Sequence, residues 1–164
     1  MNEENQNTVS EDGSEKIAQP QKIYLKDVSF ESPHAPDIFT QAWKPNLEVE
    51  IESHAEKIAD DTYDVVMKIT AKVILEGNTA FLAEVQQAGI FLLKGFEPER
   101  LQRLQNVLCL KTLYPYASAA LADLVTKGGF PSFMLAPMNF AAIYNQRIKQ
   151  QNESSGDKIV TRQQ

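Results

Sequence analysis

This chain of 164 residues is short of the side chains that build disulfides and metal centres. It contains one cysteine, Cys109, and two histidines, His34 and His54. A single cysteine cannot form an internal disulfide, and with two histidines it does not make the ligand set of a structural zinc site. We therefore expect neither a metal nor any other cofactor.

Long hydrophobic runs, glycine-rich phosphate loops and concentrated positive charge are also missing. No run approaches the roughly eighteen apolar residues of a membrane helix, and the start, MNEENQNTVSEDGSEK, lacks the basic and apolar regions of a signal peptide. We expect a cytosolic protein without membrane insertion. No GxxxxGK[ST] or GxGxxG pattern indicates a nucleotide site. A net charge of −6 argues against nucleic acid, which needs Lys and Arg gathered on one face.

Length and composition favour one folded domain between two polar ends. The chain is long enough for one core, and 43% of its residues are hydrophobic. Residues 1–20 are polar and acidic, and they bury too little apolar surface to offset the entropy lost on ordering. We expect a disordered acidic arm there, a folded domain over residues 21–150, and a flexible tail over residues 151–164.

Four segments have the patterns of strands. The first, KIYLKDVSFE, changes its apolar parity between Leu25 and Val28, which predicts a bulge. The second, NLEVEIES, and the third, DTYDVVMKITAKVILE, alternate apolar and polar residues. Gly77 and Asn78 then predict a tight hairpin connection into the fourth, FLAEVQQAGIF. The product is an antiparallel sheet.

The fourth segment carries polar residues on both of its faces. Val85 shares one face with Gln87, and Leu82 shares the other with Glu84. A strand with one face in the core and one in water should separate these residue types more cleanly. The pattern alone leaves open what each face contacts.

Helical spacing follows the strands. Pro98 is well placed in the first turn of a helix over EPERLQRLQNVLCLKTLYP, and Pro115 should open a second helix that Gly128 and Gly129 close. An apolar stretch without periodicity, FPSFMLAPMNF, leads to a last helix from about Asn139. Strands followed by helices predict an α+β fold.

Four segments resemble the SecB family of bacterial protein-export chaperones, namely DVSFESPHAPDIF, FLAEVQQAGIF, LYPYAS and FPSFMLAPMNFAAIY. The resemblance covers roughly residues 21–150. It implies a homotetramer, a dimer of dimers built from four-stranded antiparallel sheets with helices between them. It also implies an ATP-independent holdase that keeps unfolded precursors translocation-competent and delivers them to the SecA motor at the membrane. The family usually has Pro and Arg where this chain has Leu110 and Ser118, which affects the local helix geometry.

The resemblance also implies which residues face which partner. Ala83, Val85 and Gln87 match positions associated with the contact between dimers, where glutamine amides can satisfy one another. The positions associated with SecA are Asp27, Glu31, Leu82 and Glu84. Their acids would attract and orient the basic, zinc-bearing tail of SecA, so the zinc belongs to the partner. On the residues alone, an ordinary solvated strand face explains the same acids.

Apolar residues in irregular segments and on the second strand are candidates for binding unfolded clients. Aromatic rings give large contact areas with few rotatable bonds, and methionine adapts to varied shapes, which suits a protein that accepts many sequences. The loop residues could instead plug the ends of a small core. The candidates are Phe39, Trp43, Leu47, Val49, Ile51, Phe130, Phe133, Met134 and Leu135.

Two other functions fit an antiparallel sheet with helices. A small apolar ligand or lipid could bind between the layers, and thioesterase-like enzymes share the general architecture. Catalysis is disfavoured because His34 and His54 lie in polar, loop-like contexts without a serine or cysteine arrangement, and Cys109 lies on an apolar helical stretch. We expect a cytoplasmic bacterial chaperone that is not an enzyme, with a small-ligand carrier as the alternative.

Overall fold

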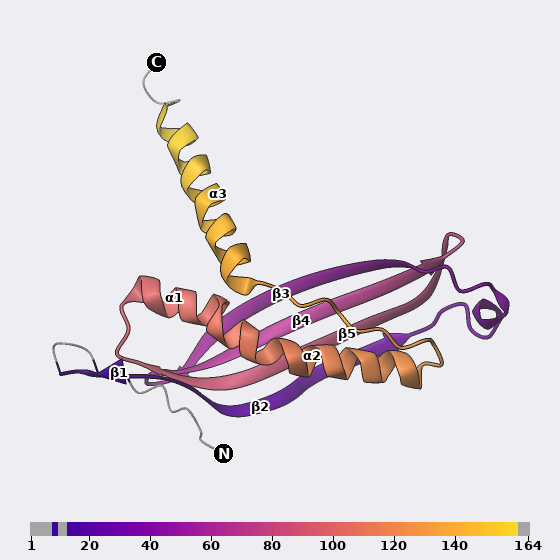
Figure 1. The fold of residues 1–164 in the computed structure, drawn as a ribbon, viewed down its shortest axis with the longest axis horizontal. Coiled ribbons are helices and arrows are strands. Elements are labelled where there is room, and N and C mark those ends of the chain that lie inside the picture. The colour runs from indigo at the N-terminus through magenta and orange to yellow at the C-terminus, as the bar shows by residue number, and fades with distance from the viewer. Residues whose placement is uncertain (1–7, 10–12, 161–164) are drawn as a thin grey trace.

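The computed structural model of this chain describes residues 8–9 and 13–160, with the side-chain surroundings of residues 13–154. The sheet has the order β1-β2-β5-β4-β3, and all neighbouring strands are antiparallel. The strands are β1 (Thr8–Val9), β2 (Glu15–Glu31), β3 (Asn46–Ala59), β4 (Thr62–Leu75) and β5 (Asn78–Lys94). The helices are α1 (Pro98–Asn106), α2 (Leu108–Lys127) and α3 (Phe140–Val160) (Figure 1). Four long strands followed by helices confirm the α+β expectation, and the two-residue β1 is an addition that pairs with the start of β2.

The predicted bulge is present in β2. The register of β2 against β5 shifts between Leu25 and Asp27. One extra residue reverses the alternation of side chains along a strand. Leu25 therefore pairs with Gln87 and Phe30 pairs with Ala83, two β5 residues of the same parity. Both halves of β2 turn their apolar residues to one side of the sheet.

Regular structure reaches further at both ends than the sequence suggested. β2 begins at Glu15, so residues 15–20 of the expected disordered arm belong to the sheet. They pair with the end of β5, where Ala18 lies opposite Leu93 and packs against the core. α3 continues to Val160, so residues 151–160 are helical and not an irregular tail. Residues 1–7, 10–12 and 161–164 lie outside the described part of the chain.

The first two helices meet at Val107 and not at Pro115. α1 ends just before Val107, and α2 begins just after it and continues through Pro115. Proline inside a helix costs about 3 kcal/mol, whereas full burial of a leucine or valine side chain contributes about 1.5–3 kcal/mol. α2 buries side chains on both sides of the proline, among them Leu113 and Leu121. Packing against the sheet therefore outweighs the local cost of Pro115.

The β4–β5 hairpin turns one residue earlier than expected. Glu76 and Gly77 connect the strands, with φ angles of 48° and 82°, and Asn78 is already the first residue of β5. Two consecutive positive φ angles are typical of the type I′ turn, whose twist matches that of the flanking strands. The hairpin is confirmed, and only its turn residues are shifted.

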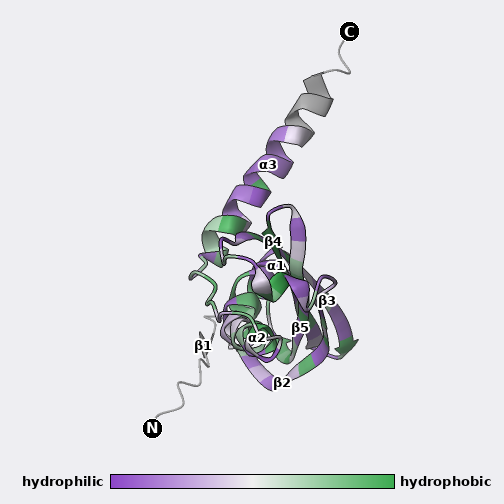
Figure 2. Ribbon diagram, turned by 90° about the vertical axis from the view of Figure 1, so that its right-hand side faces the viewer, coloured by the Kyte–Doolittle hydropathy of each residue, from purple (hydrophilic) through white to green (hydrophobic). Residues whose placement is uncertain are grey.

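The core lies between α2 and one face of the sheet. Phe81 and Phe91 of β5 and Met67 of β4 are fully buried there. Figure 2 shows hydrophobic residues gathered on α2 and on strands beneath it, and hydrophilic residues along much of α3. The end of α2 approaches β2 closely, since a Cβ on Gly128 would lie 2.2 Å from Phe30 Cζ. Only glycine allows this approach.

Cys109 on α2 is fully buried, and burial raises the pKa of its thiol to about 12. In the unfolded chain a thiol ionises at about pH 8.5. Above that pH the unfolded state has lost a proton that the native state keeps, so stability falls as pH rises. Between pH 7.5 and 10, the free energy of unfolding should fall by about 2 kcal/mol more for the natural chain than for Cys109→Ala.

Urea titrations of both proteins at the two pH values measure this difference. The variant keeps every other titrating group, so the comparison isolates Cys109. The native protein should also react with a thiol reagent at pH 8 only after urea is added. An identical pH dependence of the two proteins, together with rapid labelling without urea, would show that the thiol is accessible.

Candidate functional site

The two faces of the sheet have different surroundings. α1 and α2 lie over one face, which holds the core, while no helix of the described chain covers the other, which we call the open face (Figure 1). Paired residues on neighbouring strands point to the same face, so the register assigns each side chain to a face. Glu84, opposite Ser29, lies on the open face, and Ala83, opposite Phe30, faces the helices.

All four residues that the resemblance associates with SecA lie together on the open face. Glu31 pairs with Leu82 across β2 and β5, Asp27 pairs with Gln86, and Glu84 lies between these two pairs. Asp27 and Glu31 are exposed, whereas Leu82 and Glu84 are half-buried. The bulge permits this arrangement, because it turns Asp27 and Glu31 outward while the apolar residues of β2 turn toward the helices.

Glu84 already has a partner within the chain. Lys68 Nζ on β4 lies 3.6 Å from Glu84 Oε2 and 3.5 Å from Glu52 Oε2 on β3. The three side chains form a row of acid, base and acid across three adjacent strands. Solvent-accessible ion pairs of this kind contribute about 0–1 kcal/mol. The pair is therefore weak enough for an outside cation to replace Lys68 at Glu84.

A second polar cluster lies on the open face beside the bulge. The buried Asp64 carboxylate on β4 accepts hydrogen bonds from Tyr24 Oη at 2.7 Å and from Lys26 Nζ at 3.1 Å, both on β2. Burial raises the pKa of Tyr24, with a further contribution from its hydrogen bond to Asp64. The separate hydrogen bond that Lys26 makes to Asp64 raises the pKa of Lys26. Both bonds reach across β5 and fasten the bulged part of β2 to β4.

Asp64 is not recognisable as a buried position from its place in the sequence. An acid on an alternating strand looks like any solvated position, and its two partners lie 40 and 38 residues earlier in the chain. Only the pairing of β2, β5 and β4 brings these side chains together. The only related feature in the sequence was the parity change in β2. It predicted the bulge, but it did not show that Asp64 binds the side chains beside the bulge.

Gln87 is a polar residue on the helix-facing side of β5, and a hydrogen bond within the chain accounts for its burial there. Its Nε2 donates a hydrogen bond of 2.9 Å to the carbonyl oxygen of Tyr24, which lies next to the bulge. A bulge interrupts the ladder of backbone hydrogen bonds, and a buried polar group needs a partner. Within the chain, the glutamine therefore has a hydrogen-bond partner of its own.

The residues associated with the contact between dimers are buried in the single chain. Ala83 and Val85 are 0% exposed, and Gln87 is 5% exposed. All three are on the helix-facing side of β5, and Ala83 and Val85 belong to the core beneath α2. Within the single chain, α2 and the rest of the core cover these positions.

Apolar residues of three segments form one partly exposed surface, which we call the apolar belt. The segments are the β2–β3 loop with a short 3-10 helix (Asp37–Thr40), the helix-facing side of β3, and residues 130–139. The ring centroid of Phe130 lies 5.0 Å from those of Phe39 and Phe81 and 5.9 Å from that of Trp43. Phe130 itself is only 6% exposed, so it supports the outer rings and presents little surface of its own.

The other candidate client-binding residues divide between the surface and the edge of the core. Phe39, Trp43, Leu47, Val49 and Met134 are exposed, with Met134 the most accessible at 78%. Ile51, Phe133 and Leu135 are half-buried against the core. Leu47 and Val49 stay accessible because α2 packs over β2, β5 and β4, while β3 lies beyond it at the sheet edge.

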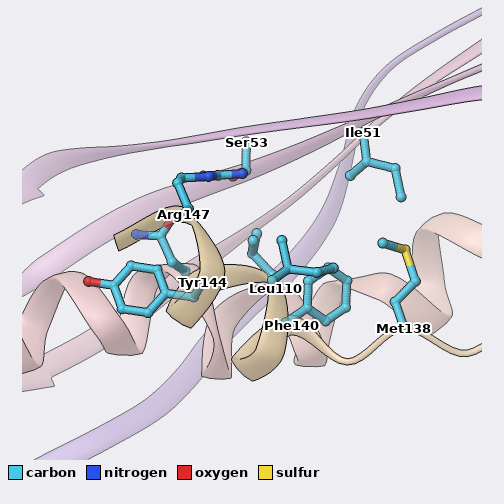
Figure 3. A pocket seen from close by; sticks show the side chains of 9 residues that line it. Ile51, Ser53, Leu110, Met138, Phe140, Tyr144 and Arg147 are labelled. Atoms are coloured by element: carbon cyan, nitrogen blue, oxygen red, sulfur yellow. The ribbon is translucent and has the colours of Figure 1, made fainter. Parts of the chain in front are cut away.

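The belt continues toward α3. Residues 130–139 run back along α2, and Tyr114 Oη of α2 donates a hydrogen bond to the Ala136 carbonyl oxygen (Figure 1). The Tyr114 ring then packs edge-on against Phe140, the first residue of α3. Next to this contact a hollow lies between β3, α2 and α3, and its lining includes Ile51, Leu110, Met138, Phe140, Tyr144 and Arg147 (Figure 3).

The two histidines have structural or exposed positions. His34 Nδ1 lies 3.1 Å from the Thr79 carbonyl oxygen, which ties the β2–β3 loop to β5. His54 is exposed within β3, so the loop-like context expected for it is wrong. The described residues include no group of three His, Cys, Asp or Glu that could hold a metal ion. Within the same residues, we find no helix with the length and apolar character needed to span a membrane.

Comparisons with known proteins identify chains that are similar to this one. Residues 11–151 match the SecB family, described as preprotein translocase subunit SecB. Protein-export protein SecB of Nitrosococcus oceani is 46% identical over 154 residues, which cover 93% of each chain. The protein of the same name from Hydrogenovibrio crunogenus is 44% identical over 147 residues, or 90% of this chain and 99% of that one.

A solved structure shares the fold. It is a SecB-like chaperone of Mycobacterium tuberculosis in complex with a ChAD peptide from the HigA1 antitoxin, and its TM-score to this chain is 0.61. The two chains are 18% identical, and the match covers 74% of this chain and 88% of that one. At this identity the likeness concerns the fold.

Replacing Asp64 by alanine should destabilise the protein. The change removes two hydrogen bonds to the buried Asp64 carboxylate, and a hydrogen bond to a charged group contributes about 1.5–3 kcal/mol, less where the donor is exposed as Lys26 is. We expect a loss of this size in the free energy of unfolding, measured by urea titration. Asp60→Ala removes the same charge at an exposed position and should change stability by less than about 0.5 kcal/mol. Equal losses in both variants would show that these hydrogen bonds do not stabilise the fold.

Proposed function

This chain belongs to the SecB family of protein-export chaperones, and on that premise we propose that it is an ATP-independent holdase. It binds unfolded precursor proteins, keeps them competent for translocation and delivers them to the SecA motor at the membrane. The observation that carries the client-binding part is the apolar belt, where aromatic and aliphatic side chains stay exposed next to one another. A continuous exposed apolar surface is typical of a protein-binding site.

The belt suits clients that share no sequence. Phe39 and Trp43 rest on the buried ring of Phe130 and offer contact area that needs little further ordering, while Met134 can adapt to varied shapes. β3 lies at the sheet edge, so an extended client can also pair with its backbone. The client is therefore recognised by exposed apolar side chains and by extended backbone.

Several contacts with one client raise the affinity of the holdase for that client. On a tetramer, several belts can engage one long chain, and linked contacts can exceed the affinity of a single contact by about a hundredfold or more. A slowly folding precursor exposes apolar segments long enough to be captured, whereas a fast folder escapes. Selection of precursors is then kinetic.

SecA docks on the open face through the surface formed by Asp27, Glu31, Leu82 and Glu84. The supporting observation is that the register of β2 and β5 places the three acids and Leu82 along one stretch of the open face, on the side of the sheet opposite the belt. A basic partner segment is steered and oriented by such acids, while Leu82 adds apolar contact. Clients and SecA can therefore be bound at the same time.

The proposed assembly is a dimer of dimers in the bacterial cytoplasm, with the helix layers between the sheets. Ala83 and Val85 contribute by supporting α2 from beneath, because they belong to the core under that helix, and Gln87 contributes by its hydrogen bond to the Tyr24 carbonyl oxygen next to the bulge. A larger or smaller side chain at these positions would move α2 and change the surface that it offers to another subunit.

Native mass measurement tests the holdase proposal. The purified protein should have the mass of four chains, and mixing with a reduced, unfolded precursor should add the mass of one precursor. The multivalent contact requires this stoichiometry. A monomer that ignores the unfolded chain but is saturated by a small apolar ligand would support the ligand-carrier alternative.

Substitutions on the two surfaces should have separate effects. Asp27→Lys and Glu84→Lys place like charges against a basic partner, so SecA affinity should fall by about tenfold or more while client affinity stays the same. Phe39→Ala and Trp43→Ala should lower client affinity by about five- to tenfold and leave SecA affinity unchanged. Titrations of each variant with SecA and with an unfolded precursor measure both quantities. Loss of both affinities in every variant would contradict the division of surfaces.

A further inference from the structure

Two lysines on the open face of β4 differ in their partners. Lys68 lies opposite Glu52 and makes ion pairs with Glu52 at 3.5 Å and with Glu84 at 3.6 Å. Lys72, four residues along the same strand and on the same face, lies opposite Glu48. Among the residues that the structure describes, Lys72 makes no ion pair within 4.0 Å. Lys68 therefore has a specific electrostatic role that Lys72 lacks.

Lys68 forms an ion pair with Glu84, the carboxylate that a basic partner would bind. Glu84 is half-buried, so few directions remain from which a cation can approach its carboxylate, and Lys68 Nζ takes one of them. An incoming Lys or Arg has to replace Lys68 at this carboxylate. The free energy needed for the replacement subtracts from the affinity of the complex.

Glu52 allows Lys68 to leave Glu84 without becoming unpaired. The ammonium group of lysine is a point charge on a flexible four-carbon stem, so it can move between two nearby carboxylates. Because Glu52 is already within 3.5 Å, Lys68 keeps one ion pair when Glu84 turns to a partner. The exchange leaves no charge without a counter-charge in either state.

We propose that Lys68 is an internal competitor for the basic partner and lowers the affinity of the open face for SecA. The inference rests on the proposed docking of SecA to the surface around Glu84. The competition would speed the release of SecA, because changes within one interface act mostly on the rate of dissociation. A delivery complex has to dissociate after each transfer, and Lys68 returns to Glu84 as the partner leaves.

Titrations of the full-length protein with SecA at one fixed salt concentration test this role. Lys68→Gln and Lys72→Gln remove the same charge from the same strand and face, so their difference reports ion pairing and not net charge. We expect Lys68→Gln to bind SecA about two- to fivefold more tightly than Lys72→Gln, the factor that corresponds to a weak ion pair. When Glu84 is replaced by Gln, Lys68 has no carboxylate there to compete for. In that background, Lys68→Gln should increase SecA affinity by no more than Lys72→Gln increases it in the natural chain.

The outcomes separate this inference from the docking proposal. If Glu84→Gln leaves SecA affinity unchanged, Glu84 is not a docking residue and the docking proposal fails. If Glu84→Gln weakens binding but the two lysine variants bind SecA equally, the docking surface stands and Lys68 is not a competitor. Client binding checks that each variant is folded. Lys68→Met, which keeps an aliphatic stem of similar length, serves as a second variant with the same expected gain.

Discussion

The bulge in β2 is the constraint on which both faces of the sheet depend. With strict alternation, Leu25 and Phe30 would lie on opposite faces, and Asp27 and Glu31 would share the face of Leu25. The extra residue lets both apolar side chains face the helices while Asp27 faces the opposite side. Side chains hold the bulge from both faces, with Gln87 bonded to the Tyr24 carbonyl oxygen on the helix side and Asp64 bonded to Lys26 on the open face. The register shift between Leu25 and Asp27 thus separates the apolar residues of β2 from its acids, Asp27 and Glu31.

The width of the sheet relative to α2 determines where apolar surface stays accessible. α2 packs over β2, β5 and β4, and β3 lies beyond its reach. The first part of β3 alternates strictly, with Glu48, Glu50 and Glu52 on one face and Leu47, Val49 and Ile51 on the other. On the apolar face Leu47 and Val49 stay exposed. The β2–β3 loop and residues 130–139 add aromatic side chains around Phe130 and extend this uncovered surface. The binding surface results from what the helix layer leaves open, and the acids stay on the other side of the sheet.

Local patterns predicted the features that depend on neighbours in sequence. The parity change in β2 gave the bulge, and Asn139 gave the start of α3, where its Oδ1 accepts a hydrogen bond from the Ala142 N–H at 3.0 Å. Features that depend on distant partners were missed. Pro115 stays inside α2 because the sheet packs against the helix on both sides of it, and Asp64 is buried because two residues of β2 reach across β5. The resemblance grouped Asp27, Glu31, Leu82 and Glu84, and the strand register places all four on one face of the sheet. Strand parity could not tell that α2 covers Val85.

Stability is unevenly distributed along the apolar belt. Residues 131–139 belong to no helix or strand, and a few tethers hold them to the rest of the molecule, among them the Tyr114–Ala136 hydrogen bond and the stacking of Phe133 on Phe81. Segments with few backbone hydrogen bonds in regular structure open at a small fraction of the free energy of global unfolding. The stretch beside β3 can therefore detach and close again while the ladder of the sheet stays intact. Because Met138 of this stretch lines the hollow between β3, α2 and α3, local opening changes the width of that hollow. The sheet and its charged face do not have to deform when chains of different bulk are accommodated.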